Sequence, residues 1–413
     1  MPIWRPYTPH YEGAPLPPNI VRAQGSYLYA ADGRVFWDGV SAWWVTIHGH
    51  SHPYIAEAIA HQARILDQVL FADFTHPKAE AVAEELNRLT GLPWVFFSDD
   101  GSTAVEVALK VALQYFRNQG QPRHRILALE GAYHGDTFGA MSVSARTTFT
   151  EAFSDYLFEV EWLPFPTDED ALEAALHSIS SRQDIAAFIG EPLLQGTAGM
   201  RVYSSRHWDA IARTVRATGA LVIADEVFTG FGRTGTLFAT DQCQEKPDIL
   251  CLSKGLTGGF LPMGLTLTSE KVFSAFYSAQ REKVLYHGHS YTGNAIASAA
   301  ALANLELWRL DETWQQLRRL THVQMELAQQ WQVQYPHIPV RQIGLVLAIE
   351  LPDEEGYFSA HRTALKAYAM ERGVFLRPLG NVAYSLPALS SQPSELRRVV
   401  EIIESYLAKV GLK

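Results

Sequence analysis

Cysteine, net positive charge and long apolar runs are all scarce in this chain of 413 residues. Its two cysteines, Cys243 and Cys251, are too few for a disulfide framework, so we expect a reducing, cytoplasmic location. The formal net charge is −10, which argues against a general affinity for nucleic acid or for anionic membranes. No apolar run approaches the length of a membrane span, and the first residues lack the pattern of a signal peptide.

The remaining composition is that of a globular protein, with 47% hydrophobic and 19% charged residues. A chain of this length exceeds one ordinary domain, so we expect one large and one smaller packed unit. No internal repeat and no low-complexity tract interrupts it. The size and composition are therefore suited to an enzyme.

Short apolar runs alternate with helical patterns from about residue 53 onward. Because these runs are continuous rather than alternating, they predict parallel strands that helices cover on both faces, which is an α/β fold. The clearest predicted strands are 94–97, 125–129, 186–189, 220–224 and 249–252. The helices predicted among them are 102–118, 168–180, 205–218 and 293–309.

Both ends of the chain have a different pattern. Residues 1–52 are rich in proline, glycine and aromatic residues, with short strands expected around a turn at 31–33. Residues 310–413 mix helical patterns with strand-like runs at 344–350 and 374–377. We expect a large domain over 53–309 with a central, mostly parallel sheet, and a smaller α+β domain formed by both chain ends, 1–52 and 310–413.

Two charged residues follow predicted strands directly. Asp225 follows the run 220–224, and Lys254 lies just beyond the run 249–252. Ligands of open α/β sheets bind at the carboxyl ends of strands. An aldehyde cofactor needs such a pair, because a lysine forms the imine and a carboxylate keeps the ring nitrogen protonated. Taken alone, Asp225 is more readily a helix cap or turn residue, and Lys254 is more readily a solvated side chain.

A third candidate lies between the strand 94–97 and the helix that follows it. Gly101, Ser102 and Thr103 stand where a helix begins, and free backbone N–H groups with two hydroxyls make a phosphate site. The alternative is an N-cap by Asp100 or Ser102. The glycine patterns of P-loop and dinucleotide-binding proteins are absent from this segment.

Several other side chains are candidates for a pocket. Tyr133 follows the strand 125–129 and can stack on a flat ring, or else pack under a loop. Arg233 and Arg377 lie in loops and can clamp a carboxylate, although a surface ion pair is the simpler reading of either. The adjacent Trp43 and Trp44 can form a core pair or the wall of a pocket.

Two histidine-rich stretches look like metal clusters. The runs 47–52 and 287–289 each contain glycine and turn-forming residues, and neither has a cysteine or carboxylate at ligand spacing. We therefore predict no metal site in this chain.

The order of these segments resembles the class III aminotransferases, which are pyridoxal-phosphate (PLP) enzymes of fold type I. Each motif is weak singly, whereas the ordered set is specific and extends over almost the whole chain. The motifs that carry the resemblance are residues 101–103, 133–135, 191–192, 225–227, 230–235, 253–254 and 287–294.

The resemblance implies a role for each candidate. Lys254 forms the Schiff base with the cofactor, and Asp225 pairs with the pyridine nitrogen. The ring lies between Tyr133 and Val227, and Glu191 supports the site indirectly. The phosphate is bound by Gly101, Ser102 and Thr103, and by Ser290 of the second subunit of a homodimer whose active site lies at the interface. The implied substrate pocket consists of Tyr7, Trp43, Trp44, Asp136, Arg233 and Arg377.

Further segments resemble the branch of this class that acts in biotin biosynthesis, which implies 8-amino-7-oxononanoate as amino acceptor. Those segments are 3–8, 41–44, 47–49, 133–143 and 376–381. The stretches 254–263 and 289–292 are closer to members that use lysine, so the amino donor stays open between S-adenosylmethionine and lysine. The rival hypotheses are an amine or ω-amino acid transaminase that uses pyruvate or 2-oxoglutarate, an aminomutase of the same fold, and a nucleotide-binding α/β protein without lysine chemistry.

Overall fold

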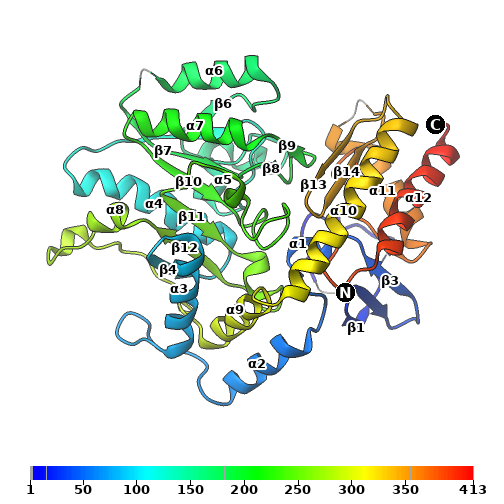
Figure 1. Ribbon diagram of the computed structural model, residues 1–413, viewed down its shortest axis with the longest axis horizontal. Coiled ribbons are helices and arrows are strands. Elements are labelled where there is room, and N and C mark those ends of the chain that lie inside the picture. Colours follow the sequence, from blue (N-terminus) through cyan, green and yellow to red (C-terminus); the bar gives the residue numbers. More distant parts are fainter. Residues whose placement is uncertain (1–2, 15, 181, 354–355, 413) are drawn as a thin grey trace.

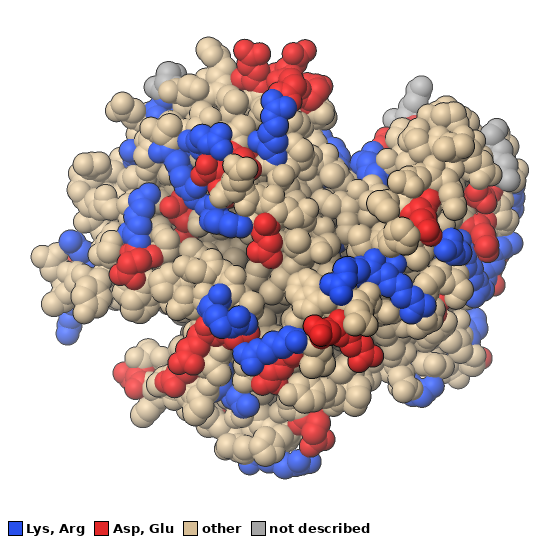
Figure 2. All heavy atoms as spheres, in the orientation of Figure 1, with Lys and Arg blue, Asp and Glu red and all other residues tan. Residues whose placement is uncertain are grey.

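The computed structural model describes residues 3–14, 16–180, 182–353 and 356–412. Figure 1 shows two lobes side by side, a larger one around a seven-stranded sheet and a smaller one that holds both chain ends. Figure 2 shows that basic and acidic side chains are interspersed over one face of the molecule. None of the helices in the described part of the chain is long and apolar enough to cross a membrane.

The central sheet has the strand order β4-β12-β11-β10-β7-β5-β6. Strands β11, β10, β7, β5 and β6 pair in parallel, whereas β12 is antiparallel to both of its neighbours. The prediction of an α/β fold with a mostly parallel sheet is confirmed. The strands are β4 Trp94–Ser98, β5 Arg125–Leu129, β6 Glu161–Leu163, β7 Ile185–Gly190, β10 Leu221–Asp225, β11 Ile249–Leu252 and β12 Gly264–Thr268.

Both faces of this sheet are covered, which explains the continuous apolar runs. In β5, Ile126 and Ala128 pack in one core cluster with α4, while Leu127 and Leu129 pack in the other with α6 and α7. This alternation follows from the two-residue period of a strand. The helices of the larger lobe are α2 Pro53–Ala63, α3 Pro77–Thr90, α4 Gly101–Asn118, α5 Phe138–Ser142, α6 Glu169–Ser180, α7 Ser205–Ala217, α8 Glu270–Ser274 and α9 Ala295–Leu307.

The smaller lobe joins the two ends of the chain through a parallel strand pair, in which Val374 of β15 lies opposite Trp37 of β3. Its two sheets have the orders β1-β2-β3-β15 and β13-β14-β16. Its strands are β1 Ile20–Gln24, β2 Tyr27–Ala30, β3 Val35–Asp38, β13 Val340–Ile343, β14 Val346–Glu350, β15 Val374–Phe375 and β16 Val382–Ser385. Its helices are α1 Ser41–Trp44, α10 Asp311–Gln334, α11 Ala360–Met370 and α12 Pro393–Val410.

Short elements complete the fold and bring loops to the sheet edge. A two-stranded hairpin is formed by β8 Leu194–Gln195 and β9 Arg201–Val202. Short 3-10 helices occur at η1 Glu151–Tyr156, η2 Ala239–Gln242, η3 Lys254–Thr257, η4 Arg281–Lys283 and η5 Gly356–Phe358. The predicted strand at 374–377 ends at Phe375, so Arg377 lies on the loop beyond it.

Candidate active site

A cavity of about 600 Å³ opens beyond the carboxyl ends of β10 and β11, and both lobes contribute to its walls. The larger lobe provides Asp225, Lys254 and the start of α4. The smaller lobe provides the tryptophan pair 43–44 and the loop after β15. Of the residues predicted for the site, those that line the cavity are Tyr7, Trp43, Trp44, Gly101, Ser102, Tyr133, Asp136, Glu191, Asp225, Val227, Lys254 and Arg377.

Lys254 is held just past the end of β11 by an uncommon backbone conformation. Its φ of 43° lies in the left-handed region, which a residue with a side chain rarely adopts. Its Nζ atom lies 4.7 Å from the centroid of the Trp44 ring and 5.6 Å from that of Phe228. Burial lowers the pKa of Lys254 to about 8, although Asp225 and Glu191 oppose this shift. The side chain is therefore an amine that loses its proton near neutral pH.

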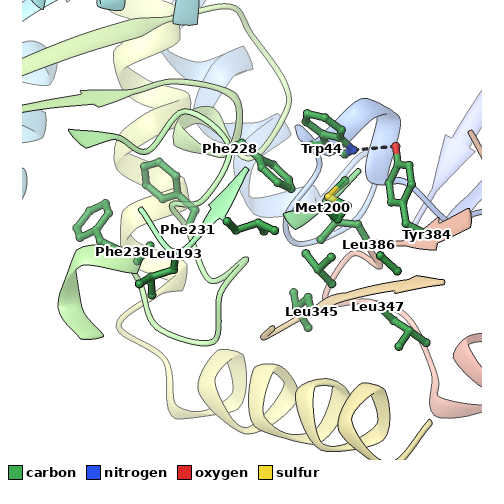
Figure 3. Close-up of a cluster of buried hydrophobic side chains, with 14 of the residues drawn as sticks. Trp44, Leu193, Met200, Phe228, Phe231, Phe238, Leu345, Leu347, Tyr384 and Leu386 are labelled. Atoms are coloured by element: carbon green, nitrogen blue, oxygen red, sulfur yellow. Dashed lines mark hydrogen bonds between the residues drawn. The ribbon is translucent and has the colours of Figure 1, made fainter. Parts of the chain in front are cut away.

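Trp44 owes its position to both lobes. Figure 3 shows its indole beside Phe228, with the indole nitrogen directed at the hydroxyl of Tyr384 on β16. The Trp44 Nε1 donates a hydrogen bond of 2.9 Å to the Tyr384 hydroxyl, and the Trp44 and Phe228 ring centroids are 4.3 Å apart. The wall beside Lys254 therefore forms only when the two lobes are packed together.

Asp225, the last residue of β10, is fixed by one hydrogen bond to each carboxylate oxygen. Its Oδ2 lies 2.6 Å from His134 Nδ1, and its Oδ1 accepts a 3.0 Å bond from the backbone N–H of Val227. His134 is buried, and its backbone N–H donates to the Ser144 hydroxyl. The sequence analysis did not assign a role to His134, and its adjacency to Tyr133 was the only signal that could have indicated one.

The start of α4 forms a cradle of backbone N–H groups. The Asp100 carboxylate accepts a 2.8 Å bond from the Thr103 N–H, and the Thr103 hydroxyl accepts one of 2.9 Å from the Asp100 N–H. Thr103 thus belongs to a capping box and does not line the cavity. A Cβ on Gly101 would lie 2.7 Å from Val227 Cγ1, so the chain passes close to Val227 only because this residue is glycine.

These groups fit PLP. An amine that titrates near neutrality, an oriented carboxylate and a helix N-terminus are the partners of an aldehyde, a pyridine nitrogen and a phosphate. Tyr133 and Val227 line the space that these three groups surround. Glu191 is fully buried nearby and accepts bonds from the backbone N–H groups of Tyr133 and Gly196. Burial raises its pKa to about 7.

The two ends of the cavity differ in charge. At one end the Tyr7 hydroxyl donates to the Asp136 carboxylate, and Tyr7 contacts Trp43 edge to face, with ring centroids 5.4 Å apart. Burial and the nearby Asp136 raise the pKa of Tyr133 well above its usual value, so this phenol stays protonated. At the other end the Arg377 guanidinium lies 4.4 Å above the Trp43 ring. Trp43 therefore separates an acidic end from a basic end.

Three predicted residues lie outside the cavity lining, namely Thr103, Arg233 and Ser290. The Arg233 guanidinium is buried and donates to the carbonyl oxygens of Trp44 at 3.0 Å, Thr46 at 2.9 Å and Pro387 at 3.3 Å. It therefore holds the loop that carries the tryptophans. The cavity also has lining residues that sequence analysis missed, and these include Phe149, Thr197, Phe228 and Arg362.

The histidine-rich stretches make other contacts. His48 Nε2 lies 3.0 Å from Asn304 Oδ1, and His287 Nε2 lies 2.9 Å from His289 Nε2. In the part of the chain that the structure describes, no group of three His, Cys, Asp or Glu side chains is arranged to hold a metal ion.

Comparison with known proteins agrees with this geometry. The family model of class III aminotransferases matches residues 9–407. An adenosylmethionine-8-amino-7-oxononanoate aminotransferase of Synechococcus elongatus is 46% identical, and the match covers 99% of each chain. The crystal structure of the enzyme of that name from Methanocaldococcus jannaschii superposes with a TM-score of 0.91 at 34% identity, over 98% of this chain and 97% of that one.

A second solved structure shares the fold but has a different name. It is an amine transaminase from an uncultivated Pseudomonas species in its PLP-bound form, with a TM-score of 0.91 and 29% identity over 99% of each chain. The family match extends over nearly all of the chain, and several relatives exceed 30% identity. The chain belongs to the class III aminotransferases.

Proposed function

We propose that this chain transfers an amino group to the keto carbon of 8-amino-7-oxononanoate, which gives 7,8-diaminononanoate for biotin biosynthesis. The cofactor is PLP. The observation that carries the proposal is one cavity in which the Lys254 amine and the Asp225 carboxylate lie at neighbouring strand ends, with Arg377 and Trp43 in the same cavity. A keto acid can place its carboxylate at Arg377 and its carbonyl toward Lys254. The two relatives named for this reaction support the choice of substrate.

Asp225 and Lys254 have separate roles in the proposed reaction. PLP, when bound, supplies a ring that withdraws electrons from the substrate carbon. Asp225, oriented by His134 and the Val227 N–H, keeps a proton on the ring nitrogen that faces it. Lys254 Nζ holds the cofactor between turnovers. As a free neutral amine, Lys254 would take the proton from the substrate carbon and deliver it to the carbon that the cofactor aldehyde supplies.

Other residues bind and orient. We assign Gly101, Ser102 and Thr103 to the phosphate, together with Ser290 from a second copy of the chain. Tyr133 and Val227 hold the ring between them, and Glu191 supports the loop that carries Tyr133. The substrate pocket comprises Tyr7, Trp43, Trp44, Asp136 and Arg377, with Arg233 acting through the tryptophan loop that it holds.

The working unit is a homodimer in which each site takes Ser290 from the partner copy. The two cysteines are free and buried, which suits a reducing, cytoplasmic location.

The test of the reaction is a variant together with a spectrum. Lys254→Ala should abolish turnover and also the yellow colour that borohydride bleaches irreversibly in the wild type. Tyr384→Phe is a suitable comparison, because it alters the wall beside Lys254 but keeps the amine. Turnover by Lys254→Ala at near the wild-type rate would overturn the proposal. A colourless wild-type protein would favour a nucleotide-binding protein instead.

The amino donor is S-adenosylmethionine in this proposal, as the names of the relatives indicate. A donor panel of S-adenosylmethionine and lysine, with 8-amino-7-oxononanoate as acceptor, identifies the donor by diamine formation. A second candidate function is amine transamination with pyruvate or 2-oxoglutarate, which the amine transaminase neighbour favours. Faster turnover with pyruvate than with 8-amino-7-oxononanoate would select that candidate, and product without any donor would indicate an aminomutase.

A further inference from the structure

Two cationic side chains line the basic end of the cavity, and two more lie close enough to interact with them electrostatically. Arg362, on α11, lines the cavity together with Arg377. Lys366 lies one helical turn after Arg362, and residues four apart share a helix face. The Lys366 Nζ lies 5.8 Å from the centroid of Phe375, two residues before Arg377. Arg5 belongs to the N-terminal segment that also brings Tyr7 to the cavity, and its positive charge repels that of Lys366.

The neighbouring cations disfavour the charged form of Lys366. Burial is the largest cause that lowers the pKa of Lys366. Repulsion by Arg377, Arg362 and Arg5 lowers it further. Among the described residues, no Asp or Glu forms an ion pair with Arg5, Lys366 or Arg377. An anion bound at this end of the cavity relieves the repulsion.

We propose that Arg5, Arg362 and Lys366 act with Arg377 as a basic pole that attracts and orients the carboxylate of an aliphatic acid, and that Lys366 is a positioning residue of this pole. In this scheme Arg377 touches the carboxylate, and Lys366 raises the positive potential around it. The inference rests on the proposed function only for the identity of the acid.

The walls of the cavity select an aliphatic acid over a more polar anion. Trp43, Pro378 and Leu379 line the cavity beside Arg377, and none of them is charged. The Arg377 guanidinium lies over the Trp43 ring and lines the cavity, and a guanidinium can donate two N–H groups to one carboxylate. An alkyl chain then runs along the apolar wall toward Lys254. Inorganic phosphate has no alkyl chain to pack against such a wall.

Binding of an unreactive acid to the holoenzyme tests this pole without turnover. Nonanoate has the chain length of the proposed acceptor but no keto group, and calorimetry gives its dissociation constant. Lys366→Gln should weaken nonanoate binding about three- to tenfold. The variant loses a positive charge whose attraction for the carboxylate is partly screened by water and salt. Nonanamide, which is uncharged, should bind both proteins alike. Added salt should weaken nonanoate binding to the wild type more than to the variant.

The matched control is Lys409→Gln. Lys409 lies on α12, with its Nζ 5.1 Å from the Tyr368 ring, and it does not line the cavity. This variant loses the same charge from the same lobe and should bind nonanoate as the wild type does. Arg362→Gln offers a second test and should weaken nonanoate binding in the same way. Equal nonanoate affinity in Lys366→Gln and the wild type would overturn the proposal.

Two further measurements separate positioning from a structural role. Since its neighbours repel Lys366, the Lys366→Gln holoenzyme should melt at or above the wild-type temperature. A lower melting temperature with equal losses for nonanoate and nonanamide would overturn the proposal. In steady state the KM for 8-amino-7-oxononanoate should rise while kcat and the donor KM change little. Charge-dependent nonanoate binding in a protein inactive on that acceptor would support the basic pole and reject the proposed reaction.

Discussion

At the scale of single residues, the role proposed for Lys254 depends on the protonation state of its amine. Burial disfavours the ammonium form, whereas Asp225, Glu191 and the ring faces of Trp44 and Phe228 favour it. The resulting pKa of about 8 leaves part of the population neutral near physiological pH. A base in catalysis works best when its pKa lies near the working pH.

We predict that the pKa of Lys254 in the cofactor-free protein is about 8, well below that of an ordinary lysine. The neutral amine is the reactive form, so its acylation rate should rise with pH and reach half its maximum near pH 8 rather than near 10.5. Competitive labelling followed by peptide mass spectrometry measures this rate residue by residue. The peptide of the exposed Lys271 provides the internal reference. A midpoint for Lys254 above pH 10 would contradict the argument.

Asp225 and Lys254 could be predicted individually because each follows a continuous apolar run, and such runs reveal strand ends. His134 could not, because its partner Asp225 is remote in sequence and becomes a neighbour only through the pairing of β5, β7 and β10. For Arg233, its chemistry favoured a carboxylate ligand, whereas the fold directs its guanidinium to three carbonyl oxygens. Its role in substrate binding stays a prediction.

At the scale of elements, the start of α4 and the loop that carries Tyr133 are fitted to each other. Gly135 has a φ of 135°, and a Cβ there would lie 2.2 Å from Ser102 Oγ and 2.9 Å from Ser102 Cα. The backbone atom cannot move without displacing the first turn of α4. This contact joins the expected ring site to the expected phosphate site.

Gly135→Ala should therefore weaken PLP binding by at least tenfold, because the methyl group pushes Ser102 away from its position. Fluorescence or absorbance titration of the cofactor-free protein gives the dissociation constant. Gly91→Ala is the control, since Gly91 also has a positive φ, 72°, but no atom within 4 Å of an added Cβ. It carries the backbone strain without the collision. Equal cofactor affinity in both variants would show that the contact with Ser102 has no influence on the site.

The pattern of elements was predictable where apolar periodicity is strong. The central strands and the helices α4, α6, α7 and α9 lie within two residues of the predicted bounds. Strand β12 was missed because its sequence GLTLT is short, alternates threonine with leucine and follows a glycine-rich loop. Arg362 was missed for another reason. Helical patterns were expected within residues 310–413, but the face that α11 turns to the cavity depends on how the lobes pack.

At the scale of the whole molecule, the two ends of the chain meet through β3 and β15, which explains how residues as distant as Tyr7 and Arg377 share one cavity. The domain bounds at residues 52 and 310 stay a prediction. The cavity contains no residue from 287–294, although this stretch is part of the family pattern. We expect Ser290 to act in the cavity of a second copy of the chain.

The surface around Ser290 supports this arrangement. Gln68 Nε2 donates to the carbonyl oxygens of Ser290 and Thr292, so the segments near 68 and 290 lie side by side. Near them in sequence, Phe74 and Tyr291 are each 64% exposed, so two large aromatic side chains lie on the surface of these segments. Such a surface is suited to burial against a second copy.

We predict a homodimer that Phe74→Asp dissociates. Analytical ultracentrifugation should give twice the chain mass of 46.1 kDa for the wild type and a single chain mass for the variant at micromolar concentration. The introduced carboxylate would be buried without a partner, which costs several kcal/mol at an interface. Because the phosphate then loses Ser290, the variant should also retain less PLP after dialysis. Val333→Asp serves as the control, since Val333 is 84% exposed on α10 of the smaller lobe and its replacement should leave the mass unchanged. A wild-type monomer with full cofactor content would contradict a shared site.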